Sequence, residues 1–196
     1  MPPAVPSPNL LTDPGFLWIS PIGTADPTNT VAGSVFTDVV AAAWLPLGPT
    51  MEGSAFAYST SVEPIRVAEL TDPVKFVTTE RSGTIAFALA SWTLSNYRRA
   101  LNGGIAALTP TSGTGATALY TVTPPVPGAE VRAMILWEST DATIRLRLKQ
   151  TIQGGEINTE FRRGTANSSI PCTFNMEIPA GATAPFDIWG AGVSRG

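Results

Sequence analysis

Few side chains in this sequence could do chemistry, and the most versatile type is missing. The chain has no histidine, so it lacks the commonest general base, the commonest metal ligand and the usual partner of a nucleophilic serine or cysteine. Its single cysteine, Cys172, follows Pro171 and precedes Thr173. A buried strand thiol is expected there rather than a nucleophile, and no intrachain disulfide is possible. We therefore predict that the protein is not an enzyme.

The remaining motifs with chemical potential are weak. The aspartates are scattered singly along the chain, and no calcium-loop spacing occurs. A pair brought together by the fold, such as Glu52 with Glu63, could act in glycoside hydrolysis, but solvated surface carboxylates are the commoner explanation. Gly113-Thr114-Gly115 lacks the remaining glycine of a dinucleotide-binding loop. We expect no catalytic residues, no cofactor and no metal.

Composition limits the class of protein. The chain has 196 residues, of which 43% are hydrophobic, which suits one domain over 1–196 with one core. Only 14% are charged, well below the ~25% of ordinary soluble domains, as for a protein that lies against other protein. Eighteen glycines and eighteen prolines favour a mainly β architecture.

Cellular location and nucleic-acid binding can also be addressed. No apolar run approaches the ~20 residues of a membrane span, and the N-terminus lacks a secretory signal, so synthesis in a cytoplasm is expected. The formal net charge is −3, and lysine and arginine are dispersed. The chain therefore lacks the basic stripe typical of tight nucleic-acid binding.

The N-terminal quarter contains nine of the eighteen prolines. Proline removes a backbone donor and resists both helix and central strand. We predict an extended arm over 1–15, a first strand at 16–19 and a long loop over 20–43.

Two hairpins and one helix are predicted in the rest. The first hairpin pairs 74–81 with 84–90 around Ser82-Gly83, with one apolar face and one small, flat face that could meet solvent, a neighbouring subunit or a channel. A helix over about 94–101 is capped by Thr93 and stopped by Asn102-Gly103. A second hairpin pairs 143–152 with 156–163, and its charged face includes Arg145, Arg147 and Lys149. The last strands are expected at 172–178 and 186–189.

Residues 44–104 resemble the central part of a siphophage major tail protein, the tail tube subunit, of the kind found in phages of actinobacteria. The matching segments, in order, are Trp44-Leu45-Pro46-Leu47-Gly48 with Thr50 and Glu52-Gly53, Ile65-Arg66-Val67-Ala68-Glu69, Asp72-Pro73-Val74, Ile85-Ala86-Phe87-Ala88-Leu89, and the helix with its caps, Thr93–Gly103. Their order and spacing cover about a third of the chain.

The resemblance implies a β-sandwich or partly closed barrel of two antiparallel sheets with one flanking helix. It also implies hexameric rings that stack into a tube through which DNA passes transiently and without sequence specificity. The partners would be further copies of the chain and the tape-measure, tail terminator and tail-tip proteins, with no membrane. The location would be the virion tail, assembled in the bacterial cytoplasm. The C-terminal immunoglobulin-like domain of some relatives is not expected here.

Candidate contact residues follow from these expectations. One of the two hairpins would line the channel, and the candidate lumen-facing residues are Thr79, Ala86, Ala88, Asn158 and Glu160. The basic side chains suit salt bridges between subunits, and the candidates are Lys75, Arg81, Arg98, Arg99, Arg145 and Arg147. The arm and the 20–43 loop are expected to become ordered when rings stack.

Two other functions fit the sequence. One is another virion structural role, a head decoration or connector protein. The other is a carbohydrate-binding or adhesin module, which five tryptophans and the Gly/Pro-rich β pattern would suit. The tryptophans mostly lie among apolar neighbours, which favours core positions over a glycan platform.

Overall fold

The computed structural model describes residues 15–38, 40–68, 71–159 and 168–192. Within these ranges the protein is mainly β with a single α-helix, which confirms the predicted fold class. The predicted arm over 1–15 lies outside the described residues except for Gly15. Among the described helices, none has both the length and the apolar character to span a bilayer.

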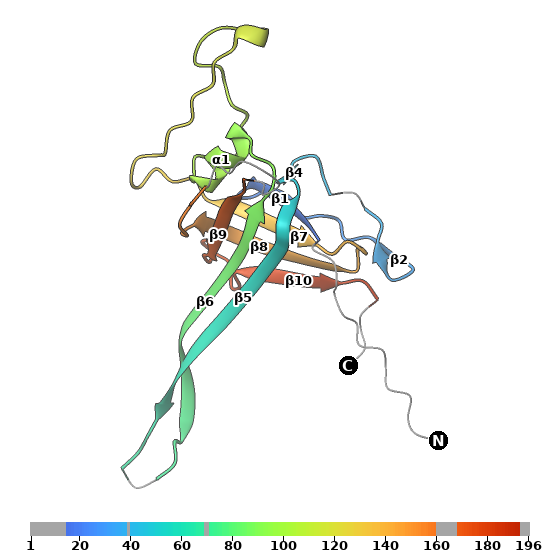
Figure 1. The fold of residues 1–196 in the computed structure, drawn as a ribbon. Helices are drawn as coiled ribbons and strands as arrows, with labels where there is room; N and C mark the ends of the chain where they lie inside the picture. Colours follow the sequence, from blue (N-terminus) through green and yellow to red (C-terminus); the bar gives the residue numbers. More distant parts are fainter. Residues whose placement is uncertain (1–14, 39, 69–70, 160–167, 193–196) are drawn as a thin grey trace.

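One large antiparallel sheet forms the body (Figure 1). Its strands are β1 (Phe16–Pro21), β4 (Leu45–Pro46), β5 (Thr50–Ile65), β6 (Lys75–Leu89), β7 (Ala133–Glu138), β8 (Ile144–Gln153), β9 (Ile170–Met176) and β10 (Phe186–Gly190). The order is β4-β1-β7-β8-β9-β6-β5, and β10 also pairs with β8. A separate small sheet joins β2 (Val31–Ala32) to β3 (Val35–Phe36). Neither sheet closes into a barrel.

The helix α1 (Leu94–Ala100) follows β6 and lies against the body. Thr93 caps it, because its hydroxyl accepts a hydrogen bond from the Asn96 N–H at 3.1 Å. Asn102 has a φ of 57°, the left-handed conformation that ends a helix. The predicted start signal at Thr93 and the predicted stop signal at Asn102 are therefore both confirmed. A single 3-10 turn (Gly115–Thr117) lies in the long segment between α1 and β7.

Two hydrophobic clusters lie on opposite faces of the sheet. The larger one packs β-strand residues such as Ile85, Ile135 and Phe174 with Ala100 of α1. The smaller one contains Trp44, Met134 and Leu136, with Trp18, Val40 and Trp189 packed against it. The tryptophans are thus mostly in apolar surroundings, although Trp92 is 45% exposed.

The predicted turn at Ser82-Gly83 is wrong. β6 runs straight through both residues, and the true partner of β6 is β5, from Thr50↔Leu89 to Ile65↔Lys75. Gly83 lies against the end of the Met176 side chain, because a Cβ there would lie 1.6 Å from Cε of Met176. Glycine in a strand interior often marks such a close approach rather than a turn.

The predicted hairpin of 143–152 with 156–163 is also wrong. β8 pairs with β7, β9 and β10 instead. The described residues 156–159 form no strand, and 160–163 lie outside the described residues. Gly154 and Gly155 again serve close packing, because a Cβ at either would collide with side chains of β9, at Asn175 and Thr173.

Candidate assembly surface

The most distinctive feature is the long β5–β6 hairpin, here called the hairpin arm (residues 50–89). Its base belongs to the body sheet, where β6 pairs with β9 through residues 84–89. Beyond Thr84 the described part of β6 has no other partner than β5, and the two strands project from the body as a twisted ribbon (Figure 1). A β-bulge between Ser61 and Val62 lies in this projecting part, where it increases the twist.

One face of the projecting ribbon is apolar and exposed. Directly paired residues share a face, and the register pairs Val62 with Thr78 and Pro64 with Phe76. Val62 is 52% exposed and Phe76 is 61% exposed. Ile65 and Val77, which pair with Lys75 and Glu63, lie on the opposite face. Over both faces and the described part of the turn, the hairpin arm exposes these large apolar side chains: Met51, Phe56, Tyr58, Val62, Ile65, Val67, Val74, Phe76 and Val77. Such a concentration outside a core typically marks an interaction site.

Aromatic contacts fix the point where the hairpin arm leaves the body. Phe186 of β10 packs edge-on against Phe56 and Tyr58, with ring centroids 5.3 and 5.2 Å apart. Gly83, opposite Tyr58, lets Met176 cross beneath the ribbon. The ribbon is therefore anchored at its base and projects in a defined direction.

The opposite face of the hairpin arm has smaller side chains near its base. Ala55 pairs with Ala86, and Ser59 pairs with Ser82, whose hydroxyls are 2.7 Å apart. Ala86 and Ala88, both predicted lumen residues, are half-buried and line a shallow hollow with parts of β5 and β9. Thr79 lies farther out and donates to the carbonyl of Ser61 at 3.3 Å. These three candidates lie on one strand, β6, and not on the two strands of the hairpin predicted around Ser82-Gly83.

The outer edge of β5 has no strand partner among the described residues. β5 is the terminal strand of the sheet order and, at sixteen residues, its longest strand. Unpaired backbone N–H and C=O groups along such an edge can pair with another chain. The edge and the apolar face together make the hairpin arm the best candidate for a contact surface.

Two of the predicted inter-subunit cations, Lys75 and Arg81, are exposed on the hairpin arm. Neither forms an ion pair with a described carboxylate. The arm also has exposed carboxylates at Glu63 and Glu80. Its charge is thus mixed and is available for pairing between copies.

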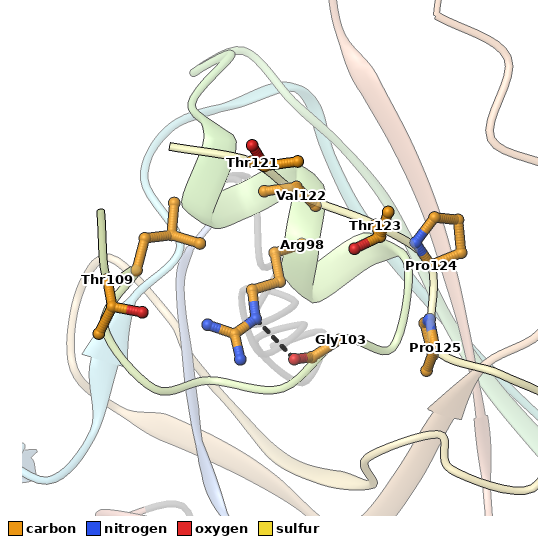
Figure 2. Close-up of a pocket in the computed structure, with 9 residues that line it drawn as sticks. Arg98, Gly103, Thr109, Thr121, Val122, Thr123, Pro124 and Pro125 are labelled. Atoms are coloured by element: carbon orange, nitrogen blue, oxygen red, sulfur yellow. Dashed lines mark hydrogen bonds between the residues drawn. The ribbon is translucent and has the colours of Figure 1, made fainter. Parts of the chain in front are cut away.

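Arg98 and Arg99 lie on α1, at the end of the body away from the tip of the arm (Figure 1). Arg98 extends into a recess of about 350 Å³ between the end of α1 and the 121–125 segment, as Figure 2 shows. Its Nε donates to the Gly103 carbonyl at 2.6 Å and its Nη1 to the Ala106 carbonyl at 3.3 Å. Arg98 therefore ties the chain after α1 to the helix.

Arg99 has a different environment. Its Nη1 donates to Oδ1 of Asn96 at 2.9 Å, and burial lowers the pKa of its guanidinium. No described carboxylate pairs with either arginine. Both remain available to an acidic group from another molecule.

Arg145 and Arg147 are not on an open surface. Arg145 is 1% exposed and pairs with Asp38 at 3.0 Å and with Glu138. Arg147 is 9% exposed and pairs with Asp26 and Asp187. Their charges are compensated within the chain, so they do not belong to the candidate contact surface. Sequence reasoning missed this because three of the four partners, Asp26, Asp38 and Asp187, are far away along the chain.

Asn158 and Glu160 are the two remaining predicted lumen-facing residues. Asn158 is exposed in a segment without strand structure, and Glu160 lies outside the described residues.

The apolar residues Val62 and Phe76 are the main omission from the predicted contact residues. The strand itself has a local signal, because small and large side chains alternate from Ala55 to Val62. The hairpin predicted around Ser82-Gly83 gives β6 the wrong partner, so the sequence does not place Val62 on one face with Phe76.

Groups with catalytic potential remain few. Cys172 is buried, and burial raises the pKa of its thiol to about 12. Among the described residues, no group of three or more acidic or cysteine side chains could hold a metal ion.

In comparisons with known proteins, no family model and no curated protein matches this chain.

Proposed function

We propose that this protein is a structural virion subunit that assembles into stacked rings, forming the tail tube of a phage. The observation that carries the proposal is the hairpin arm, whose apolar residues Val62 and Phe76 are exposed on a ribbon that projects from the body. The sequence resemblance of residues 44–104 to tail tube subunits supports the ring architecture, with six copies per ring.

The chemistry of the arm suits self-association. A second copy could pair with the open edge of β5 and cover the apolar face, which removes both the unpaired backbone and the exposed apolar area. Closing the ring would leave no strand edge exposed, which is the usual solution for β assemblies.

The proposed channel would be lined by the small-residue face of the hairpin arm, including Ala86 and Ala88. Small neutral groups neutralise no phosphates, and each neutralised phosphate would strengthen binding to DNA. A net charge of −3 further disfavours retention. Weak contact is what a conduit for DNA requires.

The contribution of the arm can be tested by sedimentation velocity. We expect wild-type protein to sediment as rings or longer assemblies, and the double variant Val62→Asp/Phe76→Asp as a monomer with unchanged circular dichroism. Both positions are already more than half exposed, so the charges should not disturb the fold.

Val126→Asp provides the matched control. Val126 is 70% exposed but lies in the segment between α1 and β7, away from the arm. This variant should assemble like the wild type. Normal assembly of the arm variant, or loss of assembly in the control as well, would contradict a specific role of the arm.

A further inference from the structure

A second feature, independent of the arm, is the loop over residues 24–38, here called the strap. The strap includes β2 and β3 and is tied together internally, because Asn29 N–H donates to Oδ2 of Asp38 at 3.1 Å and Thr37 N–H donates to the Thr30 carbonyl at 2.9 Å. It forms no strand pair with the body sheet among the described residues. The Phe36 N–H of the strap also donates to the Ala142 carbonyl at 2.8 Å, and the Phe36 side chain is 7% exposed.

Two arginines of β8 hold the strap on the sheet. Nη1 of Arg145 donates to Asp38 at 3.0 Å and to Oδ1 of Asn29 at 3.0 Å, and its Nη2 donates to the Asp38 carbonyl at 3.0 Å. The guanidinium also lies over the ring of Phe36, 4.5 Å from its centroid. Arg147 pairs with Asp26 at the other end of the strap.

Each arginine also has a carboxylate that belongs to the sheet. Arg145 pairs with Glu138 of β7, and Arg147 pairs with Asp187 of β10. Lys149 of β8 shares Asp187 at 3.1 Å. The nearby Asp141, in the turn between β7 and β8, accepts hydrogen bonds at Oδ1 from the N–H and the hydroxyl of Thr143. The charged groups that face the strap contact are therefore Asp26, Asp38, Glu138, Arg145, Arg147, Lys149 and Asp187.

This arrangement permits two states. Removing one partner of a buried ion pair is normally very unfavourable, because a charge is left without compensation. If the strap departs with Asp26 and Asp38, each arginine still has a carboxylate of the sheet beside it, Glu138 for Arg145 and Asp187 for Arg147. Neutralising the strap carboxylates Asp26 and Asp38 would weaken the ion pairs between the strap and the sheet.

We propose that the strap is an acid-released device, which detaches from the sheet when Asp26 and Asp38 are protonated while the body remains folded. The strap covers the side of the sheet that carries the tryptophan cluster, and the Ala25 carbonyl accepts a hydrogen bond from Nε1 of Trp44 at 3.1 Å. Its release therefore changes the environment of Trp44. This proposal does not depend on the tail-tube function.

The direction of the pH effect follows from Asp38. Burial alone would raise the pKa of Asp38, but the hydrogen bond and positive charge of Arg145, with backbone N–H groups, hold the pKa below its ordinary value. A depressed pKa stabilises the closed strap above the unfolded value of about 3.9. That contribution is lost as the pH falls through the depressed pKa, so release is expected below about pH 4.

Hydrogen–deuterium exchange of the full chain, corrected for the intrinsic pH dependence of exchange, tests the proposal. As the pH is lowered from 7 to 2.5, amides of the strap should lose protection while amides of β7 and β8 keep theirs, as in sub-global opening. Loss of protection in strap and sheet at the same pH would overturn the proposal. So would a strap that remains protected down to the lowest pH.

Variants test the same device at neutral pH. Asp26→Asn/Asp38→Asn should increase exchange in the strap by about tenfold or more without a change in β7 and β8. Asp72→Asn, which removes an exposed carboxylate with no described ion-pair partner, should leave the strap protected. A strap equally protected in both variants would contradict the proposal. If the double variant fails to fold, the pH series on the wild type decides the question.

Discussion

At the scale of single residues, exposure separates the arginines into two groups. Arg145 and Arg147 are buried between carboxylates, whereas Arg98 and Arg99 have no described carboxylate partner. The same residue type thus has its charge compensated by carboxylates at one site and, at the other, is held by hydrogen bonds to neutral groups of the chain. Burial, which sequence alone does not reveal, decides between the two roles.

Replacing Arg145 should be severely destabilising. Arg145→Met leaves Asp38 and Glu138 near each other without their shared cation, and a broken buried ion pair costs about 3–5 kcal/mol. Urea denaturation measures the change in the free energy of unfolding.

Arg132 offers the matched control for Arg145. It pairs with Glu177 at 3.2 Å, but both side chains are about one-third exposed. Arg132→Met should cost only about 0–1 kcal/mol, as surface pairs do. Equal losses from the two variants would contradict the importance assigned to burial.

At the scale of elements, α1 is short but firmly fixed. Nδ2 of Asn96 donates to the carbonyls of Leu47 and Ser91, each at 3.1 Å, and Asn96 is 4% exposed. At the other end, the Asn102 side chain exchanges two hydrogen bonds of 2.8 Å with the backbone of Gln153. Asn96 thus ties α1 to the segments before β5 and after β6, and Asn102 ties the chain just after α1 to the end of β8, which fixes the positions of Arg98 and Arg99.

Asn96→Ala should therefore destabilise the protein by about 1–3 kcal/mol, because buried carbonyls lose their donor. Ser95→Ala, one position earlier in α1, should change stability by no more than about 0.5 kcal/mol. Thermal or urea unfolding of the two variants provides the comparison. A similar effect of both substitutions would show that the asparagine anchor is unimportant.

Elements with local signals could be predicted from the sequence, and their partners could not. The caps Thr93 and Asn102 identify α1, and the apolar run at 16–19 identifies β1. Ser82-Gly83 and Gly154-Gly155 resemble turns, but their glycines accommodate Met176 and side chains of β9. A glycine needed for a turn and one needed for close packing look alike until the fold is known.

The candidate contact surface is a second case in which a strand can be predicted from the sequence but its partner strand cannot. Thr79, Ala86 and Ala88, three of the predicted lumen-facing residues, lie on β6, a strand that the sequence predicts in part. Val62 lies on β5, whose pairing depends on contacts across a long turn, so its exposure could not be predicted. Long-range pairing has no local signature beyond alternation.

At the scale of the whole molecule, the two candidate contact surfaces, the hairpin arm and α1 with its arginines, lie apart from each other. The hairpin arm extends from one end of the body, and α1 with its two arginines lies toward the other end (Figure 1). Different surfaces at opposite ends favour head-to-tail association, which produces rings or open stacks rather than closed dimers. This polarity, with the open edge of β5, is the physical basis of the proposed tube.

The most direct test of this account is electron microscopy of the purified wild-type protein at increasing concentration. The proposal predicts six-fold rings and stacked tubes in which the hairpin arm of each subunit contacts its neighbours. A preparation that contains only separate monomers at every concentration would contradict it.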